Sequence, residues 1–381
     1  MKRIVSCLVL LIILLGASVM FAPVDAQPKV STEKELAIDQ KLKQLNKPAV
    51  KTIHMRPSEE TRAKVAEMSS IRTPNAMPAQ IWRQNGSCPE GAVPILRVQR
   101  QQLLNISSLE NYGRKPWHGV VKQDVHSFNS SYPMVFNKQH EFYLGITGEL
   151  TVWNPRVEAN DEYSSGQFWL RNGPFLKSDS IEVGWIVYPE LYGDYTSRFF
   201  LYWTHDSSLS TGCFNVVCPG FVQTSSNSLL GAKLSPISSP GGNLYSISPI
   251  ILMDLKTYDK WWVYFDSKPI GYWPIELFGS LGKVGALALF GGDVYSPRMD
   301  KQPPHTTTQM GSGEHSIYHW GNAAFIRKPR ILGYSNEYDY PDPGQTFSRH
   351  PNCYSAENYA EIRFTEPNFY FGGPGRNGFC P

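Results

Sequence analysis

Two acidic residues stand in segments that are otherwise apolar or small. Glu182 lies inside Ser-Ile-Glu-Val-Gly-Trp-Ile-Val-Tyr-Pro, and Asp293 follows a glycine pair in Leu-Phe-Gly-Gly-Asp-Val-Tyr. A carboxylate within a sheet is costly unless it faces water or has a partner. Two such acids on one face can share a proton, so that one acts as an acid and the other as a base. Carboxyl peptidases use that chemistry, as do glycosidases with a different spacing, whereas the alternative for each residue is a solvated acid on an exposed face.

Short strands must hold these acids. In residues 181–188 apolar side chains alternate with Glu182 and its neighbours, so the two sets face opposite sides of a sheet. From about residue 138 such runs recur between turns. We expect strands at residues 141–146, 150–153, 167–170, 181–188, 198–203, 261–265, 285–290 and 323–326. Many short strands without a long helical pattern or an obvious repeat predict an all-β sandwich or barrel.

Composition supports a folded, β-rich chain. The 381 residues suit two domains after removal of a signal, and 41% hydrophobic residues exclude wholesale disorder. The 20 Tyr, 19 Phe and 10 Trp, broken by Gly and Pro, favour strands. A net charge of +3 without a basic stripe argues against a nucleic-acid partner.

The N-terminus has the pattern of a secretory signal peptide. Lys2 and Arg3 precede an apolar run at residues 4–22, and small residues at Val24 and Ala26 predict cleavage before residue 27. The alternative is a signal anchor, because the run approaches membrane-spanning length, but Pro23 and the cleavage site argue against it. We expect a secreted, extracellular protein with no membrane contact after cleavage.

In a secreted protein the cysteines are expected to form disulfides. Cys213 and Cys218 are five apart and suit a small loop, and Cys353 with Cys380 would then pin the C-terminal tail. Cys88 is left over, either free or paired with another chain. Three glycosylation sequons begin at Asn85, Asn105 and Asn129.

The polar segment from residue 27 to about 75 contains one helical pattern. Thr32 followed by Glu35 predicts a capping box, and apolar residues then recur at helical spacing until Asn46 and Pro48 end the run. A solvated linker helix and a binding role are equally compatible with this pattern. Further on we expect strands at residues 92–98 and 119–125 and a linker at residues 126–137.

Several catalytic motifs are absent. The chain has no Gly-x-Ser-x-Gly elbow, no His-Glu-x-x-His and no Walker or Rossmann glycine loop. His315 and His319 are four apart, but that spacing converges on a metal only in a helix, and the surrounding residues are not helical. We expect neither a metal nor a cofactor.

Several long motifs resemble the neprosin family, secreted plant glutamic endopeptidases. In the N-terminal part the matches are residues 51–58 (KTIHMRPS) and 82–95 (WRQNGSCPEGAVPI). In the C-terminal part they are residues 181–189, 211–223, 271–274, 305–313 and 370–375. Their order covers nearly the whole chain after the signal, which makes the resemblance far more specific than any single motif.

The resemblance implies a zymogen whose pro-segment blocks a cleft in an antiparallel β-sandwich and which, at acid pH, cleaves peptide bonds beside proline. It suggests a signal peptide at residues 1–26, a small mixed pro-domain at 27–130 and the catalytic domain at 131–381. Glu182 matches the first catalytic glutamate, whereas Asp293 stands where the second glutamate is expected. The family pairings are Cys213 with Cys218 and Cys353 with Cys380. An apoplast or cell-wall location would fit.

The shorter aspartate leaves the activity open. Asp keeps the proton chemistry of Glu, but a misplacement of about 1 Å can cost a hundredfold in rate. A backbone shift at the preceding glycine pair could recover part of that distance. Gln167 could support the site by a hydrogen bond, or could be an ordinary exposed strand residue. Tyr188, Tyr202 and Trp203 are candidates for a proline-accepting groove.

Two other functions compete with an active peptidase. The first is an inactive relative that binds peptides or glycans, which the Asp293 departure allows. The second is a two-carboxylate glycosidase, against which stands the absence of a Glu-x-Asp-x-x-Glu strand motif. We favour the peptidase, with proline-containing peptides as substrates and the pro-segment as an intramolecular inhibitor.

Overall fold

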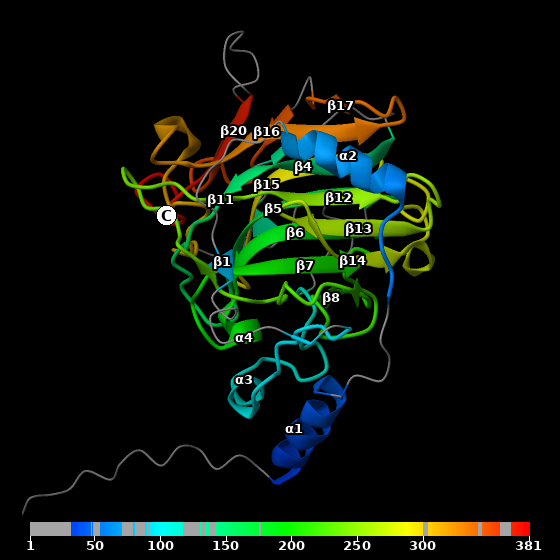
Figure 1. Cartoon of the computed structure of the whole chain (residues 1–381). Coiled ribbons are helices and arrows are strands. Elements are labelled where there is room, and N and C mark those ends of the chain that lie inside the picture. Colours follow the sequence, from blue (N-terminus) through cyan, green and yellow to red (C-terminus); the bar gives the residue numbers. More distant parts are fainter. Residues whose placement is uncertain are drawn as a thin grey trace, which may run out of the picture.

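Two antiparallel sheets packed face to face form the body of the protein (Figure 1). The computed structural model describes residues 32–46, 48, 54–70, 79–80, 88–89, 91–116, 130–131, 134–136, 142–174, 177–299, 304–341, 345–358 and 367–381. The fold is the expected all-β sandwich, preceded by a mixed N-terminal part.

The smaller sheet runs in the order β18-β3-β15-β5-β6-β7-β8, with β2 also paired to β15. Its strands are β2 (Ser130–Ser131), β3 (Met134–Phe136), β5 (Tyr163–Asn172), β6 (Asp179–Val187), β7 (Arg198–Thr204), β8 (Cys213–Phe214), β15 (Leu287–Tyr295) and β18 (Gln345–Phe347).

The larger sheet runs in the order β19-β20-β16-β4-β12-β13-β14-β9, with β11 also paired to β4 and β17 to β16. Its strands are β4 (Tyr143–Thr151), β9 (Val222–Gln223), β11 (Ser246–Ile247), β12 (Pro249–Met253), β13 (Lys260–Phe265), β14 (Lys268–Pro274), β16 (Ala324–Gly333), β17 (Tyr338–Asp339), β19 (Ser355–Asn358) and β20 (Asn368–Gly372). Short 3-10 turns, η3 (Ile275–Leu277) and η4 (Ser316–Tyr318), lie in its connections.

The core lies between the two sheets. Alternate residues of β6, including Ile181, Val183 and Trp185, are fully buried there. The indole of Trp185 donates a hydrogen bond of 2.8 Å to the carbonyl of Thr151 on β4, which ties the sheets together across the core. All nine residues of β6 are buried, so its outer face is also covered.

The N-terminal part contributes three helices and one short strand. The helices are α1 (Thr32–Leu45), α2 (Glu59–Ser70) and α3 (Arg100–Leu104), and β1 (Ala79–Gln80) pairs with β10 (Leu234–Ser235). The helix predicted from Thr32 is confirmed as α1. It is not a solvated linker, because Ile38 is fully buried in an apolar cluster that joins α1 through Leu103 of α3 to the smaller sheet.

Three local expectations were wrong or lie outside the described residues. Residues 92–98 form no strand: Pro94 has no N–H to donate, and the backbone N–H and C=O of Val98 instead bond the side chain of Asn46. Residues 130–136 contain β2 and β3 rather than a linker. The strand expected at residues 119–125 lies outside the described residues.

The two strands expected at residues 141–146 and 150–153 are one strand, β4. Gly148 stands in the gap between the two expected strands, but it lies within β4 and serves close packing. A Cβ at this position would lie 2.9 Å from Cγ2 of Ile326 on the neighbouring β16. The glycine therefore lets the strand continue beneath a bulky neighbour.

Candidate active site

Strands β6 and β15 carry Glu182 and Asp293 on the outer face of the smaller sheet. Strand β5 lies between them and pairs with both, placing Ser165 opposite Asp293 and Trp169 opposite Glu182. The even residues of β6 point away from the core because the odd ones fill it. Both acids are buried, Glu182 at 5% exposure and Asp293 at 0%.

Strand β5 supplies Gln167 to the site. Its amide Nε2 donates a hydrogen bond of 2.6 Å to Oε2 of Glu182. The hydroxyl of Ser165 donates to Oε1 of Gln167 at 2.6 Å, which fixes the direction of the amide. Gln167 is fully buried, so it is not an ordinary exposed strand residue.

Gly184, two residues after Glu182 on β6, permits the contact between Gln167 and Glu182. Gly184 lies opposite Gln167, and a Cβ there would come within 2.8 Å of the Cβ of Gln167. Any other residue would push β5 from β6 at the point where Gln167 reaches Glu182. Gly291 on β15 has a φ of +150°, a conformation that favours glycine, and it is paired with Gln167 from the other side.

Tyr163 is a site residue that the sequence analysis missed. It precedes Gln167 by four residues on β5 and shares its face, and its hydroxyl donates to Oδ2 of Asp293 at 2.8 Å. The other carboxylate oxygen of Asp293, Oδ1, is buried and has no hydrogen-bond partner among the described residues. The period of two along β5 was the available signal for Tyr163.

Lys115 of the N-terminal part occupies the space between the acids. Its Nζ lies 2.6 Å from Oε2 of Glu182 and 3.1 Å from Oδ2 of Asp293. It also lies 5.5 Å and 5.3 Å from the ring centroids of Tyr163 and Tyr202. The backbone N–H of Lys115 donates to the Tyr202 hydroxyl at 3.3 Å. No sequence pattern pointed to Lys115, because its partners lie 67 and 178 residues away.

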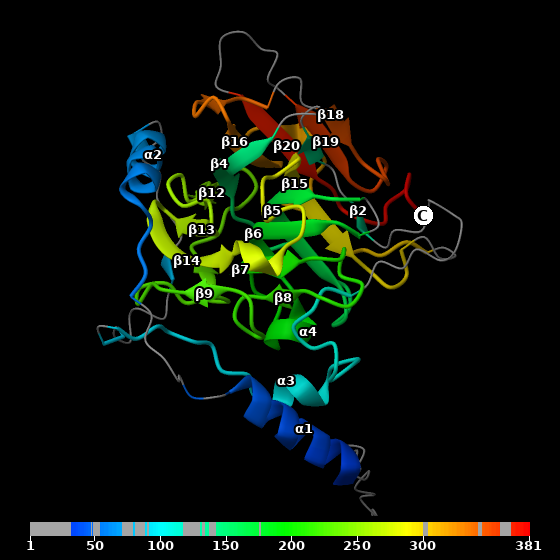
Figure 2. The same ribbon diagram turned by 90° about the vertical axis from the view of Figure 1, so that its right-hand side faces the viewer.

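Apolar packing holds the segment around Lys115 on the sheet. Ile38 of α1, Leu103 of α3 and Tyr112 pack in one cluster with Phe200 and other residues of the smaller sheet. The Tyr112 hydroxyl donates to the carbonyl of Leu191 in the short helix α4 (Pro189–Tyr192) at 2.9 Å. Figure 2 shows α1 and α3 beside the edge where β8 and α4 lie.

The aromatic candidates divide between the two faces. Tyr202 faces the site, and burial raises its pKa to about 12, so the hydroxyl stays a neutral hydrogen-bonding group. The ring of Tyr188 lies next to the ring of Tyr163, and the two centroids are 5.3 Å apart. Trp203 packs in the core between the sheets, so the prediction that it lines a groove is wrong.

The histidine pair forms no shared site. His315 and His319 flank η4, where Nδ1 of His315 bonds the Ser355 hydroxyl at 3.1 Å and Nε2 of His319 bonds Glu357 at 2.9 Å. Among the described residues, His305, Cys353 and Cys380 are the group close enough for a metal, but the two cysteines are bonded to each other.

Both disulfides suggested by the resemblance are present, Cys213–Cys218 and Cys353–Cys380. Cys88 is a free, half-buried cysteine. Asn105 is exposed, as an acceptor for a glycan must be, while the sequons at Asn85 and Asn129 and the predicted signal peptide lie outside the described residues. In the part of the chain that the structure describes, no helix is long and apolar enough to span a membrane.

The fold and the site define a class. A β-sandwich that presents two buried carboxylates on one face, linked by donors, is the arrangement of a hydrolase with a general acid and a general base. The Neprosin family model matches residues 160–374, and the Neprosin activation peptide model matches residues 30–145. The chain belongs to the neprosin family, and it combines a peptidase domain with an activation peptide.

Solved structures to which the chain is similar include two peptidases and a β-porphyranase. Scytalido-glutamic peptidase with a peptide-based transition-state analogue has 8% identity and a TM-score of 0.35, covering 64% of this chain and 97% of that chain. SCP-B, a member of the Eqolisin family of peptidases in complex with the tripeptide Ala-Ile-His, has 7% identity and a TM-score of 0.33 over the same shares. The β-porphyranase BpGH16B from the human gut bacterium Bacteroides plebeius has 12% identity and a TM-score of 0.24, covering 44% of this chain and 56% of that one.

Proposed function

We propose that this protein is the zymogen of a secreted endopeptidase of the glutamic type, which cleaves bonds beside proline at acid pH. Glu182 and Asp293 are its catalytic acids. The observation that carries the proposal is that one buried ammonium, Nζ of Lys115, contacts both acids at once. The two carboxylates are therefore close enough to act on one water and one peptide bond.

The hydrogen bonds support a different role for each acid. Glu182 accepts hydrogen bonds from Gln167 and Ser180, which fix the orientation of its carboxylate and support its assignment as the general base. Asp293 accepts a hydrogen bond from Tyr163 on Oδ2, and its other oxygen, Oδ1, has no partner among the described residues and is the atom that we assign to proton transfer. Asp293 is accordingly the general acid.

The reaction then needs no covalent intermediate. Glu182 takes a proton from water as the water oxygen attacks the scissile carbonyl carbon, and Asp293 donates its proton to the carbonyl oxygen. The C–N bond breaks when Glu182 returns its proton to the leaving amine, and Asp293 recovers a proton from the tetrahedral hydroxyl. Gln167 holds Glu182 in place throughout.

Lys115 explains why the precursor would be latent. A lysine ammonium has three donors and no acceptor, so it satisfies both carboxylates yet cannot act as a nucleophile. It occupies the position between the acids where the attacking water must lie. Protonation of either carboxylate removes one partner of the ammonium, which favours release of the pro-segment in acid.

The N-terminal pattern, the two disulfides and the exposed Asn105 support a secreted glycoprotein, and the resemblance to plant endopeptidases supports an apoplastic or cell-wall setting. We propose proline-containing peptides or proteins as substrates. Tyr163, Tyr188 and Tyr202 supply the aromatic surface next to the acids that such a substrate would contact.

The test is a peptidase assay of the secreted precursor after incubation at acid pH. A quenched peptide containing proline is compared with the same peptide containing alanine at that position. Glu182→Gln and Asp293→Asn should each lower kcat/KM about 10²–10⁴-fold, because each removes an acid–base group. Glu357→Gln, on a half-exposed acid paired with His319, is the matched control and should retain activity.

Each contrary result identifies a different error. Equal cleavage of both peptides would refute the proline preference alone. Folded, processed protein that cleaves neither peptide but binds it would favour the inactive binding protein that the Asp293 departure allows. Hydrolysis of cell-wall glucans without peptide cleavage would favour a glycosidase.

A further inference from the structure

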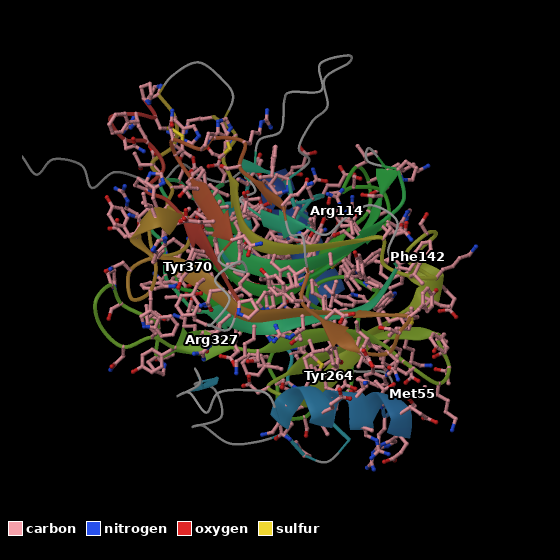
Figure 3. All side chains as sticks on the ribbon, turned by 90° about the horizontal axis from the view of Figure 1, so that it is seen from above. Met55, Arg114, Phe142, Tyr264, Arg327 and Tyr370 are labelled. Atoms are coloured by element: carbon pink, nitrogen blue, oxygen red, sulfur yellow. A yellow bond between two sulfur atoms is a disulfide. The ribbon has the colours of Figure 1, made fainter. Side chains whose placement is uncertain are left out.

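Helix α2 docks on the side of the sandwich opposite the active site. In Figure 1 it lies across the larger sheet over β4 and β12, and in Figure 2 it lies on the far side from β6 and β7. Figure 3 shows Met55 and Tyr264 beside α2 on one side and Arg114, the neighbour of Lys115, on the other. The N-terminal part therefore contacts both outer faces of the molecule.

The contact of α2 is a packed one. Thr61, Val65 and Met68 recur at helical spacing and are 0%, 3% and 5% exposed. Val65 and Met68 belong to the same apolar cluster as Trp262 and Tyr264 of β13. Burial of these two apolar side chains stabilises the contact between α2 and the larger sheet, and this stabilisation does not depend on Lys115.

Polar contacts fix the position of the helix. The backbone N–H of Ser58 donates to Oδ2 of Asp254 at 3.0 Å, and the backbone N–H of Leu255 donates to the Thr61 hydroxyl at 2.8 Å. In the middle of the helix, Nζ of Lys64 donates to the carbonyl of Asn336 at 2.7 Å. A helix of 12 residues has little stability by itself in water. Contact with this surface therefore stabilises the helical conformation as well as holding the segment in place.

We propose that the surface formed by Asp254, Leu255, Trp262, Tyr264 and Asn336, here named the α2 site, is a second binding site that holds the cut pro-segment on the mature enzyme. The inference rests on the proposed function in one respect, namely that the zymogen is activated by a cut; we place that cut between Lys115 and β2, at the boundary that the family resemblance implies. The excised pro-segment then binds in trans through two separate contacts. Such a bivalent ligand dissociates far more slowly than either contact alone would allow.

The α2 site is suited to acid conditions. Burial disfavours the charged form of Asp254, but hydrogen bonds from Ser58 and from the backbone of Lys256 and Thr257 outweigh it and lower its pKa below 3.8. The charged groups nearby are Lys256, which pairs with Glu60, and Arg62, with Tyr264 also facing the helix. The Asp254 contact is present above its ordinary pKa and is lost only as pH falls through the lowered value, so this contact of the helix persists in mildly acid conditions.

The test separates binding from catalysis. The full chain is made in the Glu182→Gln background with the recognition sequence of a site-specific viral protease inserted after residue 126, and it is cut completely with that protease. Gel filtration and native mass spectrometry at pH 7.5 and pH 4.5 then show whether the fragment that carries α2 stays with the domain. The readout needs no peptidase activity, so it stands even if the proposed function fails.

Matched variants locate the contact on α2. Val65→Asp should raise the Kd of the cut fragment about 100-fold, because it places a charge in the packed contact. Ala66→Asp adds the same charge on the exposed side of the helix and should change the Kd less than about 3-fold. If Val65→Asp prevents folding of the precursor, Thr61→Val removes only the hydroxyl that bonds Leu255 and should weaken binding about 10-fold.

Retention in the wild type and in a Lys115→Ala variant, with loss in Val65→Asp, supports the α2 site. The inference is overturned if the wild-type fragment dissociates on cutting at pH 7.5. It is also overturned if Lys115→Ala alone releases the fragment, or if Val65→Asp and Ala66→Asp bind equally well.

Discussion

At the scale of single residues, Asp293 differs from the expected glutamate but keeps contacts with Lys115 and Tyr163. The carboxylate is one methylene shorter than glutamate, yet it still reaches the ammonium that also contacts Glu182. The Tyr163 hydroxyl, which donates to Oδ2 at 2.8 Å, holds the carboxylate there. The site thus contains a complete pair of acids with a defined hydrogen-bond network.

Asp293→Glu tests how well the shorter acid is placed. If the site still fits glutamate, the longer side chain should bring the carboxyl nearer the substrate and raise kcat/KM up to about 100-fold, with KM changed little. Steady-state kinetics on the quenched proline peptide measure this. A fall in activity at unchanged melting temperature would show that the strand has adjusted to aspartate.

Tyr163→Phe tests whether the hydroxyl positions Asp293. Removing it leaves Oδ2 of Asp293 without its neutral donor, and kcat should fall about 10-fold while KM stays within about twofold. A merely structural role would instead lower the melting temperature and leave the kcat of the folded fraction intact. Ser164→Ala, one residue along β5 on the opposite face, is the control.

At the scale of elements, the packing of α1, α3 and Tyr112 holds Lys115 between the two acids, where the proposed mechanism makes it the inhibitory group. Lys115→Met keeps the length of the side chain and removes the ammonium, so the two acids lose their shared partner. We expect the uncut Met variant to hydrolyse a small peptide at a pH where the wild-type precursor is inactive. Gels run alongside the assay must show the chain intact, and an inactive, uncut variant would contradict the role of Lys115.

The sequence predicted some elements and missed others for physical reasons. Alternation in β6 identified the strand and the outward face of Glu182, because packing between the sheets imposes a period of two. The gap expected between residues 146 and 150 was wrong, because Gly148 packs closely against Ile326 within the continuous strand β4. Lys115 could not be found, since neither a period nor a spacing encodes a contact between distant segments.

At the scale of the whole molecule, the fold is suited to remain intact in acid. Burial opposes ionisation of Glu158, but hydrogen bonds from Thr307 and Arg298 outweigh it and lower its pKa to about 2. Asp194 and Asp206 have pKa values lowered well below 3.8 by donors that likewise overcome burial. These acids lie in loops at several edges of the sandwich, so the connections that frame the strands keep their charges at pH 4.

Asp206→Asn tests this account in the loop between β7 and β8, next to the Cys213–Cys218 disulfide. Asp206 accepts bonds from the backbone and hydroxyl groups of Ser210 and Thr211, and asparagine can accept fewer of them. Because the folded-state pKa is depressed, the contribution of Asp206 is fully present above 3.8 and is lost as pH falls through the lowered value. Urea unfolding should show the variant less stable by about 2 kcal/mol at pH 7 and still so at pH 5. The two proteins should approach each other only well below pH 3.8. A difference that disappears already by pH 5 would mean that the loop does not hold Asp206 charged, and that acid stability of the mature enzyme comes from elsewhere.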